Sequence, residues 1–342
     1  RLGSLPLSRI LEPAIQTAKS GAIINNAHEY LFKILDPILS HTKTGEILFK
    51  PNGKTIKAGE RFKNPDFANY LEQIIVEGSN FLYNGDLTDK IDDYMKDGGL
   101  LTREDLSNYE VIERTPLKTD FNGKTIITNP MPSPGGTLIA FALKIISKKF
   151  PGEKIDNRLL TLGMRLAQIA RSEIISTKNR TNSLAEILSP SYFKRYLDLF
   201  DYEISLKPNK EKPGSGSTTH MSIIDSQGNA ASVTTTNGEG CGYIIPGTGI
   251  MMNNILGEED LNPDGFHNWE TTKRMSTMMS PTIVIGDSGP ELVLGSGGSN
   301  RIRSAIKQVI VNKFTKNMNL EEAIQAPRIH LEENIIHCES GI

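Results

Sequence analysis

The chain changes character sharply at Thr218. Residues 207–217 contain no apolar side chain and end in Gly214-Ser215-Gly216-Ser217, a composition that predicts a mobile linker. Residues 218–224 and 230–236 are rich in threonine and in apolar side chains, and the Ser-Gln-Gly-Asn sequence between them is typical of a turn. The sequence therefore predicts a β-hairpin whose first residue, Thr218, follows directly on a loose loop.

A threonine at that place has a specific chemical potential. Its hydroxyl is a poor nucleophile without a neighbouring base, and its own α-amine can be that base once the preceding peptide bond is cut. Cleavage of the Ser217–Thr218 bond would free an amine with a reference pKa of roughly 7.7–8.0. The alternative is structural, because threonine is common in strands and Gly/Ser runs are usually linkers.

A second glycine-rich segment, Gly295-Ser296-Gly297-Gly298-Ser299-Asn300, joins an expected strand at 291–294 to an expected helix at 301–314. Backbone N–H groups at such a junction can converge on an anion, as in an oxyanion hole. The segment lacks the Gly-Lys-Ser/Thr end of a P-loop and the spacing of a dinucleotide fingerprint. A plain tight turn remains the alternative.

His220 lies two residues after Thr218 on the same expected strand, where alternate side chains share a face. The pair invites a nucleophile-and-base interpretation. A structural role fits better, since the sequence has no G-x-S-x-G elbow and no residue order that suggests a serine-hydrolase triad.

Motifs along nearly the whole chain follow one another in the order found in a known protein family. They are Thr218 to Ser222, Gly228 to Ala230, Gly249 to Asn254, Met279 to Thr282 and the glycine loop on one side of the linker, and Glu12 to Ala14, Gly98 to Leu106, Arg114 to Pro116 and Pro132 to Gly136 on the other. Through them the chain resembles the γ-glutamyltransferase (gamma-glutamyltranspeptidase) family of N-terminal-nucleophile hydrolases.

The resemblance implies an α/β fold, a four-layer αββα sandwich, made as a precursor that cuts itself between Ser217 and Thr218. Residues 1–217 would then be the large-subunit portion, incomplete at its start, and residues 218–342 the small-subunit portion, together forming one structural domain. The two portions would associate as a heterodimer, alone or as a dimer of heterodimers. Thr236 would hydrogen-bond the nucleophile, and Gly297 and Gly298 would donate to the oxyanion.

Substrate contacts follow from the same resemblance. Asn237 would help to hold the donor, and an acidic residue after Asn253-Asn254, either Glu258 or Glu259, would bind its α-amino group. The family's two serines before Met-Ser-Pro-Thr correspond to Thr277 and Met278, so one hydroxyl is kept and the other is replaced by a thioether. Ile255 stands where the family has a polar residue. These departures leave the identity of the donor open.

Composition narrows the classes of partner. The 38 basic and 40 acidic residues are dispersed, which argues against a nucleic-acid partner. The only cysteines, Cys241 and Cys338, form no CxxC pair, and no histidine spacing suits zinc, so neither a disulfide scaffold nor a structural metal site is indicated. No cofactor is expected. No apolar run is long enough to span a membrane. The chain begins without methionine, inside the expected large subunit, so localisation is left open; family members are often periplasmic or extracellular.

Periodicity and turn residues predict the scaffold. Helices are expected where apolar residues recur at helical spacing. A capping box is expected at Thr102 to Asp105, and Pro130 to Gly136 is expected to form a rigid turn. The expected helices are 7–20, with Pro13 as a kink or start, 26–39, 64–78, 137–147, 159–177 and 190–200; the expected strands are 124–129, 281–286 and 291–294; and a polar hairpin is expected at 46–57.

The leading functional hypothesis is a γ-glutamyl transferase or hydrolase. Thr218 would take the γ-glutamyl group of a glutathione-like donor and pass it to water, an amino acid or a peptide. One alternative is a related amide acylase with altered acyl specificity. Another is an unprocessed family member without catalytic activity.

Overall fold

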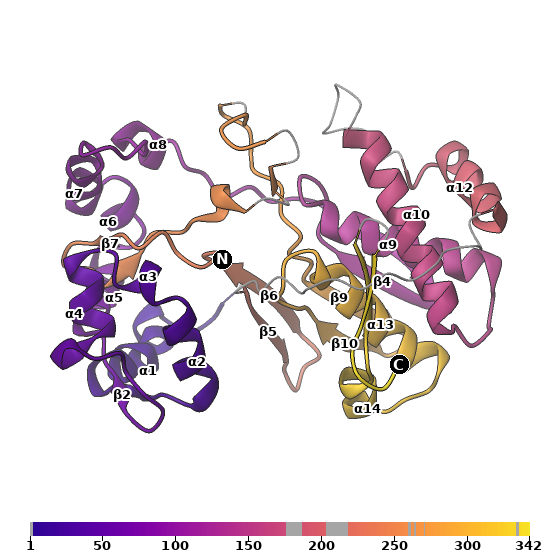
Figure 1. The fold of residues 1–342 in the computed structure, drawn as a ribbon, viewed down its shortest axis with the longest axis horizontal. Helices are drawn as coiled ribbons and strands as arrows, with labels where there is room; N and C mark the ends of the chain where they lie inside the picture. The colour runs from indigo at the N-terminus through magenta and orange to yellow at the C-terminus, as the bar shows by residue number, and fades with distance from the viewer. Residues whose placement is uncertain are drawn as a thin grey trace. The chain divides into compact units, whose positions relative to one another are not determined.

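The computed structural model describes residues 3–175, 187–202, 218–258, 261–262, 265–269, 271–332 and 335–342. The linker 207–217 and the expected site residues Ser217 and Glu259 lie outside these ranges. The chain divides into two compact units (Figure 1). The first comprises residues 1–113 and 239–254, and the second comprises residues 114–238 and 255–342. Each unit is described by itself.

The first unit is largely helical, with two short antiparallel strand pairs, β1–β2 and β7–β8. Its elements are α1 (Leu7–Ser20), β1 (Ala22–Ile23), α2 (Asn26–Ile34), α3 (Asp36–Leu39), α4 (Lys43–Phe49), η1 (Pro51–Gly53), β2 (Arg61–Phe62), α5 (Pro65–Glu77), α6 (Asn80–Tyr83), α7 (Asp86–Met95), α8 (Arg103–Ser107), β7 (Ile244–Ile245) and β8 (Ile250–Met251).

Local signals predicted several of these helices. Helix α1 runs unbroken through Pro13 and packs Ile15 against Ala68 and Leu71 of α5. The capping box at α8 is confirmed, because Thr102 Oγ1 accepts the Asp105 N–H and the Asp105 carboxylate accepts the Thr102 N–H.

Two expectations for this unit are wrong. The polar hairpin at 46–57 is instead helix α4 followed by the η1 turn, because Thr42 Oγ1 accepts the Gly45 N–H and caps a helix there. The single helix expected at 26–39 is interrupted at Leu35, two residues before Pro37.

The second unit is organised around a four-stranded antiparallel sheet in the order β10-β9-β4-β3. Its elements are β3 (Leu117–Phe121), β4 (Lys124–Thr128), α9 (Pro134–Lys149), α10 (Asn157–Ile175), α12 (Pro190–Tyr202), β5 (Thr218–Ile224), β6 (Ala230–Thr236), η2 (Ile255–Gly257), β9 (Thr282–Gly286), β10 (Gly289–Leu294), α13 (Arg301–Thr315), α14 (Leu320–Gln325), β11 (Ile329–Glu332) and β12 (Ile335–Cys338).

Helices α9 and α13 pack together, and their apolar residues share a core with the sheet: Ile139 and Leu143 of α9 and Ile310 of α13 meet Ile126 and Val284. Helix α9 is buried along almost its whole length. It begins at Pro134, earlier than the expected 137, because proline at a first helical position needs no hydrogen-bond partner for its nitrogen. Part of the expected rigid turn is therefore the first turn of α9.

The β5–β6 hairpin forms a second β layer. It contacts β9 and β10, and Ser232 Oγ donates to the carbonyl of Leu294 over 3.1 Å (Figure 1). Residues on its inward face, such as Thr218 and Thr236, are half-buried, while the alternate residues Met221 and Val233 are exposed. The helix, sheet and sheet layers confirm the expected α/β sandwich, and the expected strands at 124–129, 281–286 and 291–294 are confirmed as β4, β9 and β10.

Across the described part of the chain, no helix combines the length and apolar character needed to cross a bilayer.

Candidate active site

Thr218 opens β5 directly opposite Thr236, the last residue of β6. The Thr218 Oγ1 hydroxyl donates to Thr236 Oγ1 over 3.4 Å, and Thr236 Oγ1 accepts the Gly238 N–H at 3.0 Å. Both threonines are half-buried. The antiparallel register of the hairpin thus brings together two hydroxyls that are far apart in sequence.

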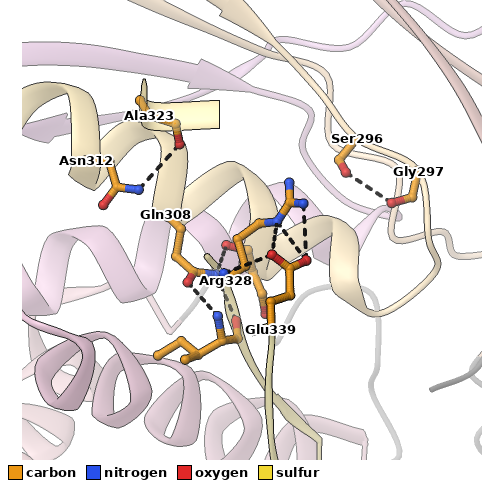
Figure 2. Close-up of polar contacts among 9 residues, drawn as sticks. Ser296, Gly297, Gln308, Asn312, Ala323, Arg328 and Glu339 are labelled. Atoms are coloured by element: carbon orange, nitrogen blue, oxygen red, sulfur yellow. Dashed lines mark hydrogen bonds and ion pairs between the residues drawn. The ribbon is translucent and has the colours of Figure 1, made fainter. Parts of the chain in front are cut away.

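The glycine loop lies against Thr218. A Cβ added at Gly297 would be 2.6 Å from the Thr218 carbonyl oxygen and 3.2 Å from Thr218 Cβ, both closer than ordinary contact. The loop is braced internally, because Ser296 Oγ donates to the Gly297 carbonyl over 3.0 Å (Figure 2). Gly298 has a φ of +103°, in the region that favours glycine. Only a glycine at 297 allows this approach to the threonine.

His220 has the structural surroundings expected of it. One ring nitrogen, Nδ1, lies 2.8 Å from Thr234 Oγ1, and the other, Nε2, lies 2.9 Å from Ser222 Oγ. The ring packs on Gly295, where an added Cβ would lie 2.1 Å from Nδ1. Burial lowers the pKa of His220, so the ring is neutral at neutral pH. Both of its nitrogens are engaged away from Thr218.

The residues expected at the donor are spread over separate loops. Asn237 is exposed at the end of the hairpin. Glu258 is half-buried in a turn that Asn262 stabilises, since Asn262 Nδ2 donates to the Glu258 carbonyl over 2.7 Å. Glu259, the other candidate for the α-amino group, lies outside the described residues, as does Ser217 at the expected cleavage site.

Thr277 and Met278 have opposite environments. Thr277 Oγ1 accepts the Met279 N–H, and the Thr277 carbonyl accepts the Ser133 hydroxyl at 2.7 Å. Met278 is only 3% exposed and packs in the core that β9 and α13 share. The Met278 thioether is therefore a core side chain.

Thr277 also lines a cavity of about 470 Å³ in the second unit. Arg114, Ser133 and Arg274 lie around the same cavity, beside apolar residues that include Met275. Sequence reasoning singled out the segments that contain Arg114 and Ser133 without assigning these side chains a role. Their convergence depends on how the loops before α9 and β9 pack, which no local pattern shows.

Among the described residues, no cluster of three histidine, cysteine, aspartate or glutamate side chains has the geometry to hold a metal ion.

Fold and site together define a class of protein. The mixed α/β sandwich, with a threonine at the head of a strand beside a glycine loop, fits the class of N-terminal-nucleophile hydrolases that the sequence motifs led us to expect. The gamma-glutamyltranspeptidase family model matches residues 1–342, so the chain belongs to this family, as the sequence motifs indicated.

Curated relatives of the chain include proteins named as glutathione hydrolases and proteins named as acylases. The chain is 31% identical over 357 residues to a glutathione hydrolase proenzyme of Escherichia coli (strain K12), covering 96% of this chain and 61% of the relative. It is 30% identical over 365 residues to the Acylase ACY 1 proenzyme of Pseudomonas sp. (strain SE83), covering 100% of this chain and 63% of the relative. The chain thus spans about three fifths of the length of these relatives.

Solved structures share the fold. The crystal structure of cephalosporin acylase from Bacillus halodurans aligns with a TM-score of 0.79 at 24% identity, over 96% of this chain and 63% of that one. The gamma-glutamyltranspeptidase of Helicobacter pylori aligns with a TM-score of 0.52 at 25% identity, over 62% of this chain and 61% of that one.

Proposed function

We propose that the protein is a γ-glutamyl hydrolase or transferase that uses Thr218 as its nucleophile. The observation that carries the proposal is the position of the Thr218 hydroxyl, 3.4 Å from Thr236 Oγ1 and beside a glycine loop so close that a Cβ added at Gly297 would lie 2.6 Å from the Thr218 carbonyl oxygen. A nucleophile, a hydroxyl that orients it and backbone donors beside it are the parts that acyl transfer needs.

Activation requires the Ser217–Thr218 peptide bond to be hydrolysed in the chain itself, which frees the Thr218 amine. That amine takes the proton from Thr218 Oγ as the oxygen attacks the γ-carbonyl carbon of the donor. The C–N bond of the donor amide then breaks, and the leaving nitrogen receives the proton. The γ-glutamyl group is left as an ester on Thr218.

Water or the amino group of an acceptor then attacks this ester and regenerates the hydroxyl. In both steps negative charge develops on the carbonyl oxygen of the substrate. The Gly297 and Gly298 amides are proposed to meet that charge, a contribution of roughly 3–4 kcal/mol per donor in comparable sites. Glycine at 297 is required on steric grounds for the loop to come this close.

After cleavage, the two portions stay associated through the sheet of the second unit. Strand β4 of the 1–217 portion pairs with β9 of the 218–342 portion from Thr125 opposite Ile285 to Thr128 opposite Thr282. Cleavage before Thr218 leaves this ladder intact. A tightly associated heterodimer of the two portions is therefore the proposed active form.

Donor binding is proposed at Asn237, at Glu258 or Glu259, and at Thr277. Thr277 shares its cavity with Arg114 and Arg274, whose positive charges favour a carboxylate-bearing substrate. Proposed substrates are a small γ-glutamyl compound such as glutathione as donor, and water, an amino acid or a peptide as acceptor.

A second candidate function is an amide acylase with a different acyl group. Burial of Met278 in the core favours it, because no hydroxyl is available at that position to grip a glutamyl carboxylate. The matched relatives include a protein named as an acylase.

A substrate panel separates these candidates. γ-Glutamyl-p-nitroanilide, glutaryl-p-nitroanilide and a simple acyl anilide are compared by kcat/KM, with Thr218→Ala as the negative control. A clear preference for the γ-glutamyl compound, lost in Thr218→Ala, supports the first function. Preference for the glutaryl or simple acyl compound supports the acylase, and no turnover of any anilide by an uncleaved chain rejects both.

A further inference from the structure

Asn300 occupies the junction between the glycine loop and α13. The Arg301 N–H donates to the Gly298 carbonyl at 3.0 Å, and the Ile302 N–H donates to the Ser299 carbonyl at 3.1 Å, so the loop winds directly into the helix. Asn300 is the N-cap residue of α13, yet its side chain makes no capping bond to the described residues of the first turn. An asparagine at this position would ordinarily stabilise its own helix.

The Asn300 side chain is bound instead by side chains of α13, α10 and β11. Its Oδ1 accepts from Arg303 at 2.8 Å and from Arg171 of α10 at 3.4 Å. Its Nδ2 donates to Glu332 Oε1 of β11 at 3.2 Å. Two helices and a strand therefore hold the residue that ends the glycine loop.

Glu332 is itself firmly placed. Its Oε2 lies 2.9 Å from His330 Nε2, and His330 Nδ1 lies 2.8 Å from Ser304 Oγ on α13. Burial raises the pKa of the Glu332 carboxyl, but the His330 hydrogen bond and the Arg303 charge outweigh it, so the pKa is lowered overall. Glu332 stays ionised at neutral pH.

Strand β11 is fixed to α13 by a pair of hydrogen bonds in the same region. Gln308 Nε2 donates to the Ile329 carbonyl, and the Ile329 N–H donates to Gln308 Oε1, each at 2.8 Å (Figure 2). Buried, fully paired polar groups of this kind resist displacement, because breaking their hydrogen bonds would leave a polar group unpaired and out of reach of water. The strand that carries Glu332 cannot drift from the helix that follows the loop.

Ser304, His330 and Glu332 form a hydrogen-bonded series like that of a serine, histidine and acid relay, but their burial excludes that role. Ser304 is 5% exposed and His330 is 9% exposed, so no substrate can reach the serine. The series continues to Asn300, whose Nδ2 donates to Glu332. Asn300 is three residues after Gly297, the glycine that lies against Thr218.

We propose that Asn300, held by Glu332 and Arg303, is a positioning residue that fixes the glycine loop against Thr218. The inference rests on the proposed function in assigning the loop to catalysis, while the restraint on the loop itself is a property of the fold. Loss of the Asn300 side chain lets the loop move by a fraction of an ångström, which weakens transition-state contacts more than ground-state binding.

Asn300→Ala and Asn319→Ala form a matched pair that tests this. Asn319 is also a helix N-cap, but its side chain caps α14 by accepting the Glu322 N–H at 2.9 Å. Steady-state kinetics on the anilide and hydrogen exchange of the peptide covering 295–300 are measured for both variants. Asn300→Ala is expected to lower kcat about tenfold to a hundredfold with KM within about twofold, and to speed exchange in the loop.

Asn319→Ala is expected to lower the melting temperature and leave kcat and loop exchange unchanged. Glu332→Gln keeps an oxygen that accepts from Asn300 and should retain most of the activity, whereas Glu332→Leu should resemble Asn300→Ala. Unchanged loop exchange in Asn300→Ala overturns the inference, with or without turnover. Faster loop exchange in an enzyme without γ-glutamyl turnover supports the positioning role while rejecting the proposed function.

Discussion

Gly297→Ala is the sharpest perturbation of the proposed site. Its new Cβ would lie 2.6 Å from the Thr218 carbonyl oxygen, whereas ordinary contact begins at 3.4 Å, so the loop or the threonine must move by about 0.8 Å (3.4 − 2.6). A misplacement on the order of 1 Å at a reacting centre costs about a hundredfold in rate, and loss of one oxyanion donor costs about a hundredfold to a thousandfold. We therefore expect kcat on the anilide to fall about a hundredfold.

The stability cost should be moderate, since overpacking costs about 1–3 kcal/mol. Gly163→Ala is the matched control, because its Cβ would meet Ile146 Cδ1 at 2.8 Å inside the helical core, where only the end of a flexible side chain must move. Thermal unfolding and kcat are measured for both variants. The reasoning fails if Gly297→Ala retains kcat within about twofold of the unmodified protein, or if Gly163→Ala loses as much activity.

Three further changes have definite expected outcomes. Thr236→Val keeps the branched strand side chain but removes the oxygen that Thr218 contacts, so kcat should fall at least about tenfold. The melting temperature should fall modestly, because the Gly238 N–H loses its acceptor. An unchanged kcat would show that this hydroxyl is dispensable. Met278→Ser removes a core thioether and should lower the free energy of unfolding by about 2–5 kcal/mol. It should not increase the preference for the γ-glutamyl anilide. A gain in that preference with no loss of stability would contradict the placement of Met278 in the core. Burial lowers the pKa of Lys307 from 10.5 to about 7. Between these two pH values the unfolded chain binds more protons at this lysine than the folded chain does. The free energy of unfolding should therefore rise with pH across that window, by up to about 5 kcal/mol. Lys307→Met should abolish the rise and be more stable at pH ~7 in urea titrations; an equal rise in both proteins would reject this explanation.

Sequence reasoning succeeded where structure depends on neighbours along the chain. The hairpin at Thr218, the glycine loop and the capping box at Thr102 are all local patterns, and each was found. Strand β3 was missed, and the helix at Lys43–Phe49 was mistaken for a hairpin because the Pro-Asn-Gly turn that follows it dominated the pattern.

Features made by distant residues had no local signal. Asn300 joins Arg171 of α10, Arg303 of the helix that it precedes and Glu332 of β11, and Arg171 lies 129 residues away from it in the chain. Met278 stands where the family resemblance led us to expect a substrate-binding side chain, yet it packs in the core with residues of β9 and α13. Burial rather than motif position decides what that residue does.

The central claim is that Thr218 becomes a free N-terminal residue. N-terminal sequencing of the purified protein, separated on a denaturing gel, tests it directly. The account predicts a smaller fragment that begins Thr-Thr-His-Met and is absent from Thr218→Ala. A single intact chain that turns over the anilide, or a fragment that begins at any other residue, would contradict it.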